Sequence, residues 1–170
     1  MNRTSLLVLS ALLLSGTVVS AQPLSPADQA AVQRAADQFL SGLEKNAYYD
    51  VTAEDVMARI KAGKPDYVIL DVRVPKDKKY DKGHLPGAQF AAVYDVAKPE
   101  TLARLPKDKD IFVHCDTGQQ QNKAVAALRM MGYTAYAMKW GYMAWSPAPP
   151  TALTLEAING SITKGYPVEK

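Results

Sequence analysis

The chain contains a single cysteine, Cys115, which is the side chain best suited to act as a nucleophile. It follows the apolar run 111–114 and opens a polar loop that ends at Gln120. A loop between a strand and a helix can direct backbone N–H groups inward and stabilise negative charge on a thiolate or persulfide. Gly118 permits a close backbone approach. We therefore expect a reactive thiol, with a buried, inert cysteine as the alternative.

The other titratable groups near this loop are weaker candidates. His114 precedes the cysteine, but neighbouring residues on a strand point to opposite faces, so we expect it to face away from the sulfur and to have a packing or hydrogen-bonding role. His84 lies far away in the sequence, and two histidines with one cysteine give no metal-ligand spacing. Lys123 and Lys139 lie outside the loop and are expected to be solvated.

Short apolar runs alternate with segments of helical periodicity around this loop. We expect strands at 48–51, 67–72, 88–92, 111–114 and 134–138, and helices that begin after Thr52, at 99–105 and at 121–131. This alternation predicts an α/β fold with a mainly parallel sheet and helices on both faces. Cys115 would then lie beyond the carboxyl end of its strand, where open α/β sheets bind ligands.

The first residues are typical of a secretory signal peptide. A basic residue, Arg3, precedes an apolar stretch at 6–14 and small residues that end at Ala21. A membrane anchor is the alternative, but the apolar stretch is shorter than the roughly 20 residues that a spanning helix needs. We expect cleavage after residue 21 and a periplasmic or secreted protein. One cysteine cannot form an intramolecular disulfide there.

The remainder of the chain is divided into an N-terminal helix at 22–47, one domain at 48–146 and a C-terminal tail at 147–170. Ser25 and Pro26 predict the start of the helix, which should end near Asn46. Its expected inward face consists of Val32, Ala36, Phe39, Leu40 and Leu43. The tail is expected to be a short helix or a loosely docked end. The net charge of +3 is too mild to predict nucleic-acid binding.

Several motifs in order give the chain a resemblance to the rhodanese family. These are VILDVR at 68–73, GHLPGA at 83–88, HCDTGQQ at 114–120, MGY at 131–133 and WGYMAW at 140–145. The resemblance implies a rhodanese-like fold with a five-stranded sheet, and a catalytic Cys115 that takes sulfane sulfur from a donor such as thiosulfate as a persulfide. The acceptor would be cyanide or a thiol, and no metal or organic cofactor is implied.

The resemblance also implies roles for the residues around the cysteine. Those expected to contact substrate are Asp116, Thr117, Gly118, Gln119 and Gln120. Those expected to support the site structurally are Asp71, Arg73 and His84.

The loop differs from that of thiosulfate-using rhodaneses, which commonly carry Arg or Lys inside it. None of the residues 116–120 is basic, and Asp116 should disfavour an anionic donor. Persulfides and polysulfides therefore stay open as donors. A rhodanese-like module that binds a protein partner or sulfur species without turnover is the alternative function. A cysteine phosphatase or arsenate reductase is a weaker hypothesis, because no arginine ends the loop to bind an oxyanion.

Overall fold

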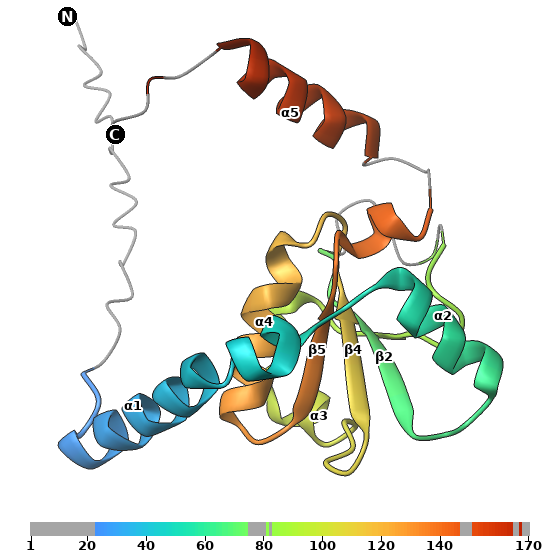
Figure 1. The fold of residues 1–170 in the computed structure, drawn as a ribbon. Coiled ribbons are helices and arrows are strands. Elements are labelled where there is room, and N and C mark those ends of the chain that lie inside the picture. The colour runs from blue at the N-terminus through green and yellow to red at the C-terminus, as the bar shows by residue number, and fades with distance from the viewer. Residues whose placement is uncertain (1–22, 75–80, 82, 147–150, 165–166, 168–170) are drawn as a thin grey trace, which may run out of the picture.

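A computed structural model describes residues 23–74, 81, 83–146, 151–164 and 167. The sheet has five strands in the order β1-β5-β4-β2-β3, and all of its neighbouring pairs are parallel (Figure 1). The strands are β1 (Asp50–Val51), β2 (Tyr67–Asp71), β3 (Gln89–Phe90), β4 (Asp110–His114) and β5 (Thr134–Met138). The predicted α/β class and five-stranded sheet are thus confirmed, and the sheet is parallel throughout.

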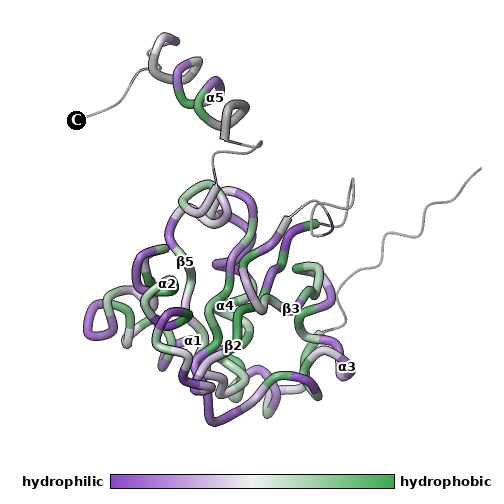
Figure 2. Tube along the Cα trace, turned by 90° about the vertical axis from the view of Figure 1, so that its right-hand side faces the viewer, coloured by the Kyte–Doolittle hydropathy of each residue, from purple (hydrophilic) through white to green (hydrophobic). Residues whose placement is uncertain are grey.

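The two central strands have continuous apolar sequences because both of their faces are covered. β2 and β4 pair along their full lengths, from Tyr67 opposite Asp110 to Asp71 opposite His114. Ile69 and Leu70 on β2 and Ile111 and Val113 on β4 are at most 1% exposed. Figure 2 shows hydrophobic segments around β2 in the middle of the domain, with hydrophilic segments toward its outside.

Helices cover both faces of the sheet, as the sequence predicts (Figure 1). α2 (Ala53–Ala62) lies on one face and begins with a capping box between Thr52 and Asp55, which confirms the predicted helix start. α3 (Pro99–Leu102) and α4 (Gln119–Met130) lie on the other face. Each face has its own apolar cluster, with Val56 and Phe112 on the α2 side and Val113 and Leu128 on the α4 side.

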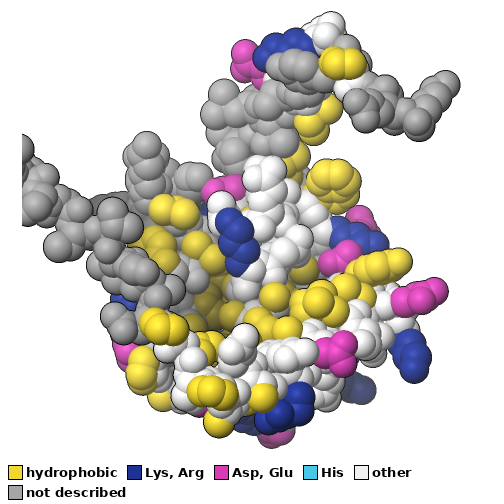
Figure 3. All heavy atoms as spheres, turned by 90° about the vertical axis from the view of Figure 1, so that its left-hand side faces the viewer, with side chains coloured by type: hydrophobic (Ala, Val, Ile, Leu, Met, Phe, Trp, Pro, Cys, Tyr) yellow, Lys and Arg dark blue, Asp and Glu magenta, His cyan; other side chains and the backbone are white. Residues whose placement is uncertain are grey.

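The N-terminal helix, α1 (Pro26–Ser41), contacts α4 with only part of its length and extends beyond the domain (Figure 1). Phe39 stacks on Tyr49, with 5.6 Å between the ring centroids, and Leu43 packs beside it. The prediction that Val32 and Leu40 face the domain is wrong, because they are 52% and 60% exposed. Figure 3 shows hydrophobic side chains among charged ones on the face that carries α1.

Short 3₁₀ helices and one further helix complete the description. They are η1 (Glu44–Tyr49), η3 (Val93–Asp95), η4 (Gly141–Ala144) and α5 (Thr151–Lys164). The tail therefore contains a helix, and Figure 1 shows it apart from the sheet. The predicted signal peptide at 1–21, most of the charged run 76–82 and the proline-rich stretch 147–150 lie outside the described residues. None of the described helices has the length and apolar character to cross a membrane.

Candidate active site

Cys115 lies directly after β4, in the loop that leads into α4. The backbone N–H of Gly118 donates a hydrogen bond to its Sγ, with 3.2 Å between nitrogen and sulfur. Gly118 is the N-cap of α4 and has φ 95°, a conformation that favours glycine. The sulfur therefore receives a backbone amide beside the positive end of a helix dipole, which stabilises negative charge.

The thiol is more enclosed than an open loop would suggest. Cys115 is 2% exposed and belongs to the apolar cluster on the α4 side, together with Ala124 and Val125. The sequence predicts several amides directed at the sulfur, whereas among the described residues one amide, that of Gly118, donates to Sγ. The thiol therefore presents little surface to solvent.

The backbone of Cys115 is held from both sides. Its N–H donates to Oε1 of Gln121, with 2.9 Å between the two atoms, and its carbonyl oxygen accepts from the N–H of Tyr142 at 2.7 Å. Gln121 is 1% exposed and also donates from Nε2 to the carbonyl of Met138 at the end of β5. One buried amide side chain thus joins the carboxyl ends of β4 and β5 and fixes Cys115 between them.

The η4 segment packs directly on the cysteine loop. Besides the bond from Tyr142 to Cys115, the N–H of Met143 donates to the carbonyl of Asp116, at 3.1 Å. Both loop carbonyls therefore face η4, so the N–H groups of the same planar peptides point away from it. Gly141 makes this packing feasible, since a Cβ there would lie 2.5 Å from the carbonyl oxygen of Cys115.

A buried ion pair lies beside the loop. Arg73 and Asp71 are 4% and 0% exposed, and both Nε and an Nη of the guanidinium donate to the carboxylate. The same guanidinium donates to the carbonyl of Gly83 at 2.6 Å and lies 4.4 Å from the centre of the Tyr142 ring. The pair therefore joins the motif at 68–73, to which it belongs, to the motifs at 83–88 and 140–145.

His114 completes this network on the side away from the sulfur. Its ring stacks on that of Tyr142, and its Nε2 lies 3.7 Å from Oδ2 of Asp71, beyond hydrogen-bond distance. Burial lowers the pKa of His114, and the negative charge of Asp71 opposes this effect. The imidazole is therefore neutral near neutral pH and serves as a packed element of the network.

The residues expected to contact substrate lie between Cys115 and the first turn of α4. Asp116, Thr117 and Gly118 are half-buried, whereas Gln119 is exposed in the first turn of α4. Gln120 accepts a hydrogen bond from Nζ of Lys123, so this ammonium lies at the end of the loop but on an exposed surface. His84, one of the expected support residues, is exposed in the segment after Gly83.

Gln121 is the residue whose role sequence analysis missed. The available signal was its spacing, because it lies three, four and seven residues before Ala124, Val125 and Leu128, all buried on one face of α4. A polar side chain on an apolar helix face needs a buried hydrogen-bonding partner.

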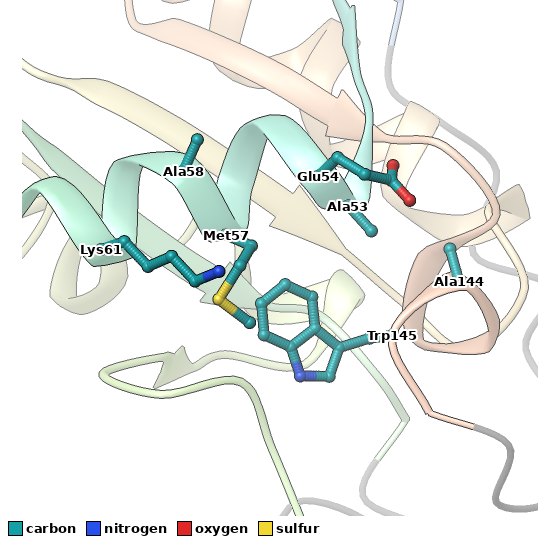
Figure 4. A pocket seen from close by; sticks show the side chains of 7 residues that line it. All are labelled: Ala53, Glu54, Met57, Ala58, Lys61, Ala144 and Trp145. Atoms are coloured by element: carbon teal, nitrogen blue, oxygen red, sulfur yellow. The ribbon is translucent and has the colours of Figure 1, made fainter.

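A pocket of about 440 Å³ lies elsewhere, between α2 and the segment after η4. Figure 4 shows the indole of Trp145 facing Met57, with the side chain of Lys61 beside them. This pocket is on the α2 side of the sheet, whereas Cys115 packs on the α4 side. Trp145 therefore does not border the thiol, and the pocket is separate from the candidate active site.

Comparison with known proteins gives consistent results for sequence and structure. The chain is 26% identical over 98 residues to a protein named "Sulfurtransferase" from Allochromatium vinosum, a match that covers 57% of this chain and 87% of the relative. It is 33% identical over 79 residues to the "Probable adenylyltransferase/sulfurtransferase MoeZ" of Mycobacterium tuberculosis, a match that covers 46% of this chain. The chain spans only 20% of that relative's length.

Two solved structures have the same fold. A rhodanese-like domain protein from Staphylococcus aureus superposes with a TM-score of 0.51 at 25% identity, over 57% of this chain and 90% of the other. The rhodanese-like domain of an Anabaena protein superposes with a TM-score of 0.51 at 30% identity, over 56% of this chain and 71% of the other. A family model, the rhodanese-like domain, matches residues 52–148, more than half of the chain. This protein therefore belongs to the rhodanese-like domain family and is homologous to sulfurtransferases, with its single cysteine in the loop where that family's activity is expected.

Proposed function

We propose that the protein is a sulfurtransferase or sulfur carrier that forms a persulfide on Cys115. The observation that carries this proposal is the position of Sγ at the start of α4, where it accepts a hydrogen bond from the amide of Gly118. A thiolate there is stabilised by a fixed dipole that does not have to reorganise during the reaction. The relatives named as sulfurtransferases support the same chemistry.

The reaction has two displacement steps. In the first, the Cys115 thiolate attacks the outer sulfur of the donor, the donor's S–S bond breaks, and its electron pair leaves with the rest of the donor as sulfite or a thiolate. In the second, a thiolate or cyanide attacks the outer sulfur of the persulfide, and Cys115 leaves as a thiolate. Gln121 and Tyr142 keep the cysteine backbone in place through both steps.

The substrate contacts proposed are Asp116, Thr117, Gly118, Gln119 and Gln120. The side chains of these residues carry no positive charge, so recognition of an anionic donor would rely on backbone dipoles. Asp71 and Arg73 would act at a distance, by holding the Gly83 segment and Tyr142 next to the loop. His84 is included with them as a structural support on the grounds of the family motif alone.

A second function is favoured by one feature, the near-complete burial of the thiol at 2% exposure. In this alternative the domain binds a protein partner or a sulfur species without turnover. The two functions differ in whether Cys115 changes covalently.

We also propose that the protein is exported to the periplasm or outside the cell after cleavage of residues 1–21, since that segment has the pattern of a signal peptide.

Intact mass spectrometry would separate the two functions. The purified protein is incubated with thiosulfate or with a polysulfide, and we expect one added sulfur atom that cyanide then removes. Cys115→Ser should gain none, whereas a substitution at the exposed Asn122, which lies outside the loop, should leave the adduct in place. Absence of any sulfur adduct with both donors would refute the transferase and favour the binding module.

A further inference from the structure

Trp140 combines two unfavourable features next to the candidate active site. Its backbone is left-handed, with φ 63° and ψ 2°, a conformation that costs any residue with a side chain more than it costs glycine. Its indole is 65% exposed, the largest value among the exposed large hydrophobic residues of the described part of the chain. Backbone strain of this kind is found more often at functional sites than elsewhere.

The position of Trp140 connects it to the thiol. A Cβ placed on Gly118 would lie 3.4 Å from the Cα and from the backbone nitrogen of Trp140, so the two backbones are in contact. Gly118 is the residue whose amide donates to Sγ of Cys115. The next residue, Gly141, packs against the carbonyl of Cys115. The strained tryptophan therefore lies on the surface directly beside the loop that carries Cys115.

We propose that Trp140 is a specificity-determining residue that contacts the organic group of a small organic persulfide, R–S–SH, while Cys115 takes its outer sulfur. This rests on the proposed persulfide chemistry of Cys115. In the transfer step the Cys115 thiolate attacks the outer sulfur of R–S–SH, the donor's S–S bond breaks, and R–S⁻ leaves, so that charge and atoms balance.

Two observations favour an organic donor over an inorganic anion. The loop 116–120 has no basic side chain to bind thiosulfate, and Asp116 adds a negative charge next to the cysteine. Thiosulfate is also too small and too polar to cover an indole, whereas an aromatic or alkyl group gains free energy by removing that apolar surface from water. Covering a fraction of the indole would raise kcat/KM by about tenfold.

The test compares two persulfides that differ only in the organic group, benzyl persulfide and methyl persulfide, each released in solution from a masked precursor. The rate of sulfur transfer to Cys115 is measured by intact mass, and the ratio of the benzyl to the methyl rate is taken for each variant. We expect this ratio to fall about tenfold in Trp140→Gly. Trp140→Phe, which keeps an aromatic ring, should retain most of it.

Tyr48 provides a matched control. It also has a left-handed backbone, with φ 61°, and is 64% exposed, but it lies before β1 at the edge strand, and β5 separates β1 from β4. Tyr48→Gly removes an exposed ring and relieves the same backbone strain, so the benzyl-to-methyl ratio should stay at the wild-type value. An equal change of the ratio in both variants would overturn the proposal.

Thermal unfolding distinguishes this role from a packing role. Trp140→Gly loses some side-chain contacts but relieves the left-handed strain, so we expect its Tm to stay within about 4 °C of the wild type. A fall of more than about 8 °C, together with an unchanged ratio, would show that the indole serves packing. If no persulfide forms on Cys115 with either donor, the proposed function fails. If both donors react and the benzyl-to-methyl ratio is the same in Trp140→Gly as in the wild type, only the role of Trp140 is refuted.

Discussion

Gln121 provides the sharpest test of how the thiol is positioned. Its side chain is 1% exposed and has two backbone partners, the N–H of Cys115 and the carbonyl of Met138. Gln121→Met keeps the length and approximate volume of the side chain but removes the amide. Both backbone groups then stay buried without these partners, at the carboxyl ends of two adjacent central strands.

The magnitude follows from the cost of unpaired buried groups. Each buried backbone group that loses its partner destabilises a protein by about 1–3 kcal/mol, so the two together should cost about 2–6 kcal/mol. In a domain of this size each kcal/mol corresponds to about 2–4 °C in Tm, which predicts a fall of roughly 4–24 °C. The rate of persulfide formation should also fall by on the order of tenfold or more, since a small displacement of a nucleophile is costly.

The assays are thermal unfolding and urea titration for stability, and intact mass for sulfur transfer. Gln119→Met is the matched control, because Gln119 lies two residues earlier in the same helical turn but is exposed. The control should change Tm by no more than about 2 °C. A loss of stability below about 1 kcal/mol in Gln121→Met would refute the view that its two hydrogen bonds hold the strand ends.

Three further substitutions test the remainder of the site. Asp71→Asn should destabilise the protein by about 3–5 kcal/mol in urea titrations, because it leaves the buried guanidinium of Arg73 without its counter-charge; a loss below about 1 kcal/mol would contradict this. Burial lowers the pKa of His114, so on acidification this side chain takes up a proton more readily in the unfolded state than in the folded state. The free energy of unfolding should therefore decrease as the pH falls below about 6.5. The Tm of His114→Gln should change less than that of the wild type between about pH 7.5 and 5.5. An equal change of Tm with pH in both proteins would contradict the role of His114 in this pH dependence. Gly118→Ala introduces a side chain at φ 95°, next to the backbone of Trp140, so it should destabilise the loop by about 1–2 kcal/mol and slow persulfide formation. An unchanged rate by intact mass would show that the loop does not need glycine at this position.

The sheet and the position of the cysteine loop could be predicted because their signals are local. Apolar runs separated by helical segments determine a parallel α/β sheet, and the pair Thr52 and Asp55 marks the start of α2 within four residues. Cys115 follows an apolar strand and precedes a helix, which is sufficient to place it at the carboxyl edge of the sheet. The number of strands came with the family resemblance, whereas the order of the strands was not predicted.

The features that escaped prediction depend on contacts between distant segments. Helical periodicity gave α1 an apolar face, but it could not show that the helix extends past α4 and leaves Val32 and Leu40 in solvent. The packing of η4 on the loop depends on Gly141 meeting Cys115, which lies on another strand connection. The left-handed backbone of Trp140 contradicts local preference, so no propensity rule would predict it.

The absence of a loop cation and the exposure of Trp140 together predict how donor preference can be changed. A basic side chain would favour thiosulfate by its charge, whereas an indole would favour a donor through the donor's organic group. Asp116→Arg should therefore raise the rate with thiosulfate by about tenfold or more and leave the benzyl-to-methyl persulfide ratio unchanged, because both persulfides have the same reacting group. In Trp140→Gly, by contrast, the benzyl-to-methyl ratio should change, whereas the rate with thiosulfate should stay as in the wild type. If Asp116→Arg changes the ratio as much as Trp140→Gly does, charge and organic group are not recognised by separate residues, and the account of both residues is wrong.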